Sequence, residues 1–135
     1  MKSNEITNTL TLDQMSKVNK ISLDKLRAYV GNNDSDIKDM IELFRQTVPV
    51  QQSKMELFMS KRDWDNLNYI AHQMKPSLDI LGLDASKEKA RIIESLAKTG
   101  EETELLKKFV AELSTDLDEV REALEHELEN LNHNH

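Results

Sequence analysis

Cysteine is absent from this sequence of 135 residues, and glycine and proline are scarce, at three and two residues. Without cysteine the chain forms no disulfide framework, no iron–sulfur or thiolate–zinc site and no cysteine nucleophile. This absence also fits a reducing compartment. So few glycine and proline residues cannot supply the turns of a sandwich or barrel built from many short strands. The composition therefore favours a small number of long helices.

Long apolar runs are also missing, since the longest is Ile80-Leu81-Gly82-Leu83. A membrane-spanning helix needs about 20 apolar residues, and the first twenty residues lack the apolar core of a signal peptide. We therefore expect a cytoplasmic protein. The net charge of −7 arises at the C-terminal end, because residues 101–135 hold three basic and eleven acidic side chains. An acidic chain without a basic stripe is a poor candidate for nucleic-acid binding.

Apolar residues at three- and four-residue spacing predict the helices. A short helix with Leu23 and Leu26 should end at Gly31, and either Asp34 or Ser35 should cap the next helix. Four longer helices are expected over about 35–60, 63–81, 84–98 and 102–128. We predict an all-α fold, an antiparallel four-helix bundle with a short extra N-terminal helix. Residues 1–20 should form a polar arm, 21–131 the bundle and 132–135 a frayed tail.

One histidine lies apart from the apolar stripe of the helix predicted over 63–81. On a helical wheel at about 100° per residue, His72 lies about 140° from the middle of the stripe and therefore points outward. Its face is otherwise built from Asn68, Lys75, Pro76 and Asp79. An ordinary surface histidine would have the same wheel position.

Two neighbours of His72 favour a functional site. Lys75 lies one turn away, where its ammonium can reach a group attached to the imidazole. Pro76 stands inside the helix, where proline costs about 3 kcal/mol relative to alanine. A neutral imidazole is nucleophilic near pH 7, and a nearby cation offsets the charge of an acquired phosphate. The pair could carry a phosphoryl group, although the chain has no glycine-rich nucleotide loop.

A metal site is a weaker interpretation of the C-terminal histidines. Glu122, His126 and Glu129 could share one helix face, but zinc sites need ligands that converge and a second shell that holds them. A bundle-core metal site would need Glu-x-x-His motifs, and Glu122 to His126 has the wrong spacing. We therefore interpret these residues as a solvated charged face and predict no metal site.

The sequence from Ala71 to Gly82, AHQMKPSLDILG, resembles the signature of histidine-containing phosphotransfer (HPt) domains, roughly A-H-x-L-K-G-S-[SA]-x-x-[LIV]-G. The wider pattern is similar too. Phe44 lies in a helix of suitable length, and Lys61-Arg62-Asp63-Trp64 stands where the family commonly has G-D-W. The resemblance extends from about residue 22 to residue 128.

The resemblance implies a role for each matching residue. His72 would be the phospho-acceptor, through its outer ring nitrogen, and Lys75 would neutralise the phosphoryl group. Ser77 would help close helix packing, and Gly82 would end the motif helix. Around them, Asn68, Pro76 and Asp79 would form the partner-docking surface.

Two positions depart from the family pattern. Pro76 stands where the family usually has glycine, and its ring adds both bulk and a flat apolar surface to the docking face. Leu78 stands where the pattern has a second serine or alanine, and the wheel places it in the core. The first departure bears on docking, and the second bears only on packing.

The function that the resemblance implies is phosphotransfer in a two-component phosphorelay. A response-regulator receiver domain would donate a phosphoryl group from its aspartate to His72, another receiver would take it, and a hybrid sensor histidine kinase is a further possible partner. The chain would be a monomeric phosphocarrier rather than an autonomous kinase. It would bind no cofactor, since the Mg²⁺ would belong to the receiver. The alternative is a non-catalytic helical adaptor, an HPt-like bundle without phosphotransfer.

Overall fold

A computed structural model describes residues 21–133, so the predicted arm over 1–20 and residues 134–135 lie outside the described part. The described residues form helices and connecting turns without a strand. The helices are α2 (Asp24–Val30), α3 (Asp34–Ser60), α4 (Trp64–Ile80), α5 (Asp84–Leu96) and α6 (Thr103–His133). The prediction of an all-α bundle with a short extra N-terminal helix is confirmed.

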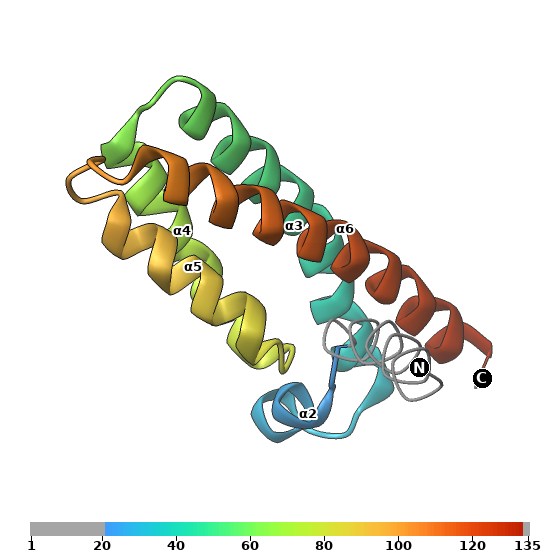
Figure 1. The fold of residues 1–135 in the computed structure, drawn as a ribbon. Coiled ribbons are helices and arrows are strands. Elements are labelled where there is room, and N and C mark those ends of the chain that lie inside the picture. Colours follow the sequence, from blue (N-terminus) through green and yellow to red (C-terminus); the bar gives the residue numbers. More distant parts are fainter. Residues whose placement is uncertain (1–20, 134–135) are drawn as a thin grey trace, which may run out of the picture.

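Four of the helices close into a bundle. Each of α3, α4 and α5 packs against the helix that follows it, and α6 packs back against α3 (Figure 1). Short connections make successive helices antiparallel. At 27 and 31 residues, α3 and α6 are much longer than α4 and α5, which have 17 and 13. The long helices therefore extend past the α4–α5 hairpin, and α2 lies at that end of the bundle (Figure 1).

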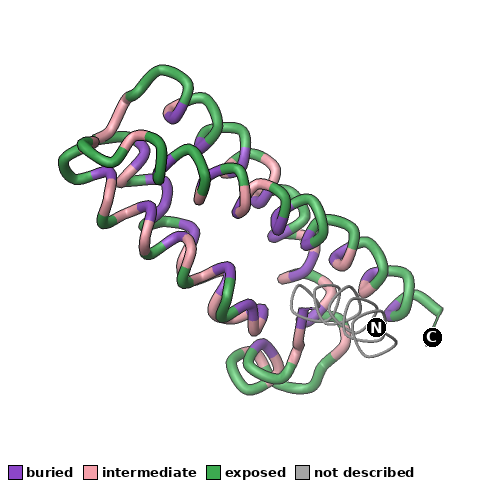
Figure 2. The backbone as a smooth tube through the Cα atoms, viewed as in Figure 1, coloured by how far each residue is buried: buried purple, intermediate pink, exposed green. Residues whose placement is uncertain are grey.

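The core lies along the inward faces of the helices (Figure 2). The apolar stripe predicted for α4 is buried from Leu67 to Leu81, while Trp64 at its start is half-buried. Leu78 is 2% exposed, which confirms its place in the core. Ile70 and Val110 are also buried.

Helix ends follow the predicted pattern with three corrections. Asn33, rather than Asp34 or Ser35, caps α3, because its side chain accepts hydrogen bonds from the backbone N–H groups of residues 35 and 36. Asp63, at the predicted start of the helix over 63–81, caps α4. Helix α5 ends at Leu96, two residues early, and α6 continues to His133 instead of ending near residue 128. Buried Leu131 stabilises this last part of α6.

Two buried polar side chains fix neighbouring helices against α6. The Nε2 group of Gln52 on α3 donates to the backbone oxygen of Ser114 at 3.0 Å and to Asp118 Oδ1 at 2.8 Å. Asp116 Oδ2 accepts from Ser86 Oγ and Lys89 Nζ on α5, both at 2.9 Å. Because an unpaired buried polar group is costly, these bonds favour one register of the helices.

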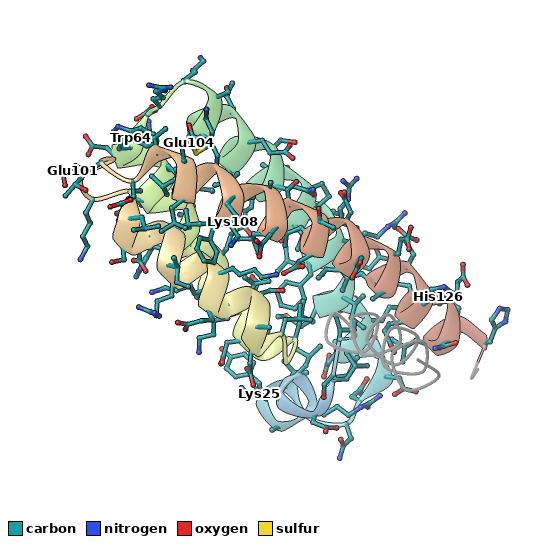
Figure 3. All side chains as sticks on the ribbon, in the orientation of Figure 1. Lys25, Trp64, Glu101, Glu104, Lys108 and His126 are labelled. Atoms are coloured by element: carbon teal, nitrogen blue, oxygen red, sulfur yellow. The ribbon has the colours of Figure 1, made fainter. Side chains whose placement is uncertain are left out.

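The turn between α5 and α6 depends on Gly100, which has a φ of 69°. A Cβ at this position would lie 2.2 Å from the indole Nε1 of Trp64, on the same end of the bundle as Glu101 (Figure 3). We therefore expect Gly100→Ala to lower the free energy of unfolding by more than about 1 kcal/mol, through backbone strain and displacement of the indole. Urea denaturation measures the loss.

Trp64→Leu provides the matched background. Removing the indole takes away the collision and leaves the backbone strain of the Gly100→Ala change at a φ of 69°. The loss caused by Gly100→Ala should therefore be smaller in the Trp64→Leu chain than in the original chain. Equal losses in the two backgrounds would contradict a packing role for Gly100.

Candidate functional site

His72 lies on the outer face of α4, and its side chain is 64% exposed. The residues that bury the opposite face, including Ala71 and Met74, hold α4 against the bundle. Its Nδ1 atom lies 2.6 Å from Oε2 of Glu94, a residue of α5. No described residue hydrogen-bonds the other ring nitrogen, Nε2. The ring is therefore held at one nitrogen and accessible at the other.

Glu94 connects His72 to Lys75. Its second carboxylate oxygen, Oε1, lies 2.6 Å from Lys75 Nζ, and the Glu94 side chain is only 19% exposed. The Lys75 ammonium, and to a lesser extent His72, hold the pKa of the Glu94 carboxyl below its usual range against the opposing effect of burial. Glu94 is therefore a carboxylate at neutral pH.

This arrangement selects one form of the imidazole. An ionised carboxylate accepts hydrogen bonds and cannot donate them, so Nδ1 of His72 must carry the proton that it shares with Glu94. In the neutral ring the lone pair then belongs to Nε2. The contact with Glu94 thus presents a nucleophilic nitrogen to solvent and fixes the plane of the ring.

Asn68 was predicted to contribute to partner docking, and the structure gives it an internal contact as well. Its Nδ2 group donates to the backbone oxygen of Glu94 at 2.6 Å, in a partly buried position. This bond ties α4 to the turn of α5 that carries Glu94. Asn68 therefore helps to place the carboxylate beside His72.

Asp79 joins three helices. Its Oδ1 atom accepts from Lys25 Nζ of α2 at 3.1 Å and from Lys87 Nζ of α5 at 2.9 Å. The hydrogen bond from Lys87, followed by that from Lys25, lowers the pKa of the Asp79 carboxyl. The Asp79 side chain is still 42% exposed, so a partner could reach it. Its carboxylate is already paired with the two lysines, however, and these contacts also fix its position.

Pro76 lies inside α4, which continues for one more turn to Ile80. Because proline has no N–H, the carbonyl of His72 lacks its usual donor four residues on. Pro76 is exposed, and it borders an open cleft of about 510 Å³ between α4 and α5. The residues lining this cleft are Lys75, Pro76, Asp79, Asp84, Lys87, Glu88 and Arg91.

The two residues predicted to serve packing lie at the C-terminal part of α4. Ser77 is half-buried. Gly82 has a φ of 75°, and a Cβ on it would lie 2.9 Å from Cβ of Ser22. The backbone N–H of Ser22 also donates to the carbonyl of Leu81 at 2.8 Å. Gly82 therefore lets the segment before α2 pack against the end of the motif helix.

Sequence reasoning missed Glu94, which completes the site. It lies 22 positions after His72 on a different helix, so no local spacing connects the two residues. Only the packing of α5 against α4 brings them together. A helical wheel of α5 that matched its acidic residues with Lys75 of α4 could have suggested a carboxylate beside His72.

The remaining candidates from the sequence lie elsewhere. His126 is exposed near the C-terminal end of α6, at the opposite end of that helix from Glu104 (Figure 3). Within residues 21–133, no three histidine or acidic side chains lie close enough together to hold a metal ion. None of the helices in this part of the chain is long and apolar enough to cross a membrane.

Comparison with known proteins gives one match. Residues 39–123, more than half of the chain, match the Hpt domain family. No curated protein and no solved structure matches the sequence. The matched range contains His72, Lys75 and Glu94 and therefore the contacts among these three residues.

Proposed function

Because the chain belongs to the Hpt domain family, which acts in phosphotransfer in two-component signalling, we propose that it carries a phosphoryl group on Nε2 of His72. A receiver domain of a response regulator donates the group from its phosphoaspartate, and the aspartate of another receiver takes it away. Hpt domains interact with receiver domains. Beyond the general role of the family, the proposal specifies His72 as the acceptor, Nε2 as the reacting nitrogen, and transfer from one receiver to another.

The contact of Glu94 with both His72 and Lys75 is the observation that carries this proposal. Nδ1 of His72 and Nζ of Lys75 each lie 2.6 Å from one oxygen of the same carboxylate. The carboxylate supports the tautomer that is nucleophilic at Nε2, while Lys75 remains one turn from the reacting nitrogen. A surface histidine without function would not require either contact.

The transfer step exchanges one phosphorus bond for another. The Nε2 lone pair attacks phosphorus in line, a P–N bond forms, and the P–O bond to the receiver's aspartate breaks, so the aspartate leaves as a carboxylate. The ring then carries the phosphoryl group on Nε2 and its proton on Nδ1, facing Glu94. Such transfer depends mainly on positioning and on compensation of charge.

Lys75 can supply that compensation by changing partner. Its side chain is 25% exposed, and it is paired with Glu94 in the structure described here. When a dianionic phosphoryl group arrives on His72, the ammonium can contact a phosphoryl oxygen instead of, or together with, the Glu94 carboxylate. The receiver supplies the Mg²⁺ for the reaction, and this chain supplies no cofactor.

His72, Lys75 and Glu94 contact one another within one chain, so the proposed transfer needs no residue from a second copy. A docked receiver would cover His72, and the exposed ring of Pro76 on the same helix offers it an apolar contact. Asp79 lies one turn further along α4 and adds a charged group at the edge of that surface.

Pro76 also supports the alternative function, a helical adaptor that binds receivers without accepting phosphate. Its ring stands where family members usually have glycine, so it could prevent the close approach that transfer requires. Incubation with a receiver phosphorylated on its aspartate separates the two functions. Acid-labile phosphate on the chain supports transfer, and stable binding without labelling supports the adaptor.

Replacing Lys75 with alanine should slow phosphoryl acceptance by about tenfold, the effect of losing roughly 1.4 kcal/mol of charge stabilisation. The free energy of unfolding should change by less than about 1 kcal/mol, as for other partly exposed ion pairs. Rapid-quench measurement of phosphohistidine formation tests the rate. Lys107→Ala, which removes an exposed lysine from α6, is the control, and equal rates in the two variants would assign Lys75 to surface charge alone.

A further inference from the structure

An apolar stripe runs along the outer face of α3. Leu43, Val50 and Leu57 are 49%, 52% and 47% exposed. They are seven residues apart, so in a helix they lie almost in line. At about 100° per residue, all three lie about 140–180° from the middle of the buried face of α3, which includes Ile41 and Met55. The stripe therefore faces away from the bundle.

The stripe is symmetric about its middle residue. Leu43 precedes Val50 by seven positions, and Leu57 follows it by seven. We propose that this stripe binds the same stripe of a second copy of the chain, with the two α3 helices antiparallel and a two-fold axis at Val50. Each Leu43 then packs against Leu57 of the other copy, and the two Val50 side chains meet at the axis.

The charges beside the stripe fit this antiparallel arrangement. The same symmetry places Asp39 opposite Lys61 of the other copy, because both lie eleven positions from Val50. It also places Gln46 opposite Lys54. Asp39 and Lys61 are exposed, and neither forms an ion pair with another residue in the described range 21–133.

A parallel arrangement lacks this complementarity. It would place Asp39 beside Asp39 and Lys61 beside Lys61, and like charges at such positions repel. The acidic start and basic end of the outer face of α3 therefore select the antiparallel pair. This orientation distinguishes a second copy from an unrelated partner, which would not need a symmetric pattern.

The size of the stripe sets the expected strength. With 27 residues, α3 is about 40 Å long at 1.5 Å per residue. A single pair of helices with three apolar residues from each copy falls at the low end of specific interfaces, where complexes are weak and transient. The structure thus points to a dimer that forms at micromolar or higher concentration, while monomers predominate at lower concentration.

Sedimentation velocity over a range of concentrations tests the dimer. The 15.6 kDa chain should shift to the dimer as its concentration rises. Val50→Glu places two carboxylates at the two-fold axis and should raise the dissociation constant at least tenfold. Leu105→Glu, at a 39% exposed leucine of α6, should leave it unchanged. Circular dichroism establishes that both variants remain folded.

A charge exchange tests the antiparallel register. Asp39→Lys alone places two lysines opposite each other and should weaken the dimer, and Lys61→Asp alone should do the same with two aspartates. The double variant restores both pairs in reversed order and should recover most of the association. A double variant weaker than either single variant would overturn the register.

Two results would overturn the dimer itself. The chain could remain monomeric at millimolar concentration, or Val50→Glu could dimerise as strongly as the original chain. In the first case, reduced receiver binding by Val50→Glu would assign the stripe to the receiver instead. Because the sedimentation experiment needs no phosphoryl group, its result is independent of the function proposed for His72.

Discussion

Replacing His72 with glutamine is expected to abolish phosphoryl acceptance. Glutamine offers an amide in place of the imidazole lone pair, so no P–N bond can form at this position. The labelled fraction after incubation with a phosphorylated receiver should fall to the background of the assay. Since His72 is 64% exposed, the free energy of unfolding should change by no more than about 0.5 kcal/mol.

The exposed histidine on α6 is the matched control for this variant. His126→Gln removes an imidazole from a helix surface far along α6 from its start, and it should accept phosphate as the original chain does. Equal labelling of His72→Gln and the original chain would refute the proposed acceptor. Loss of labelling in both variants would also refute it, because the phosphate would then depend on a residue outside the described site.

Replacing Glu94 with glutamine is expected to slow phosphoryl acceptance by about 10- to 100-fold, by analogy with the loss seen when the hydrogen-bond partner of a metal-ligating histidine is removed. The glutamine amide can donate an N–H to Nδ1 of His72, which a carboxylate cannot do. That hydrogen bond favours the tautomer with the proton on Nε2 and so blocks the nucleophile. Lys75 also loses its charged partner.

Two measurements separate this role from a merely structural one. The ¹⁵N chemical shifts of the His72 ring report the tautomer directly, and Glu94→Gln should move the proton from Nδ1 to Nε2. Glu88→Gln is the control, because Glu88 lies on the same helix and pairs with Arg91 at 2.9 Å without contacting His72. An unchanged tautomer and rate in Glu94→Gln would show that the contact with Glu94 does not position the ring.

The fold could be predicted from the sequence because each helix carries its own local signal. Three- and four-residue apolar spacing located the helices, and Gly31 and Gly82 marked the ends of two of them. The largest boundary error came at the end of α6, where Leu131 packs against the bundle. Such packing depends on how far α3 and α6 extend together, and local spacing does not contain that information.

In the predicted site, too, local spacing reveals some residues and tertiary packing determines the others. His72 and Lys75 lie one turn apart on one helix, so the sequence could place both on the outer face. Glu94 comes from the neighbouring helix and escaped detection. Asn68 and Asp79 share the predicted face, but their contacts with α5 and α2 follow only from tertiary packing. A helical wheel gives the direction of a side chain and leaves its partners undetermined.

Because α2 packs against α3, the folded unit of this chain is longer than the part that matches the family. The family match begins at residue 39 and ends at residue 123, inside α3 and α6. Leu26, Ile37 and Leu128 lie outside it and are nonetheless at most 5% exposed. A fragment cut at the limits of the match would lose the Asn33 cap and these contacts, so a transfer assay should use a protein that keeps residues 21–133.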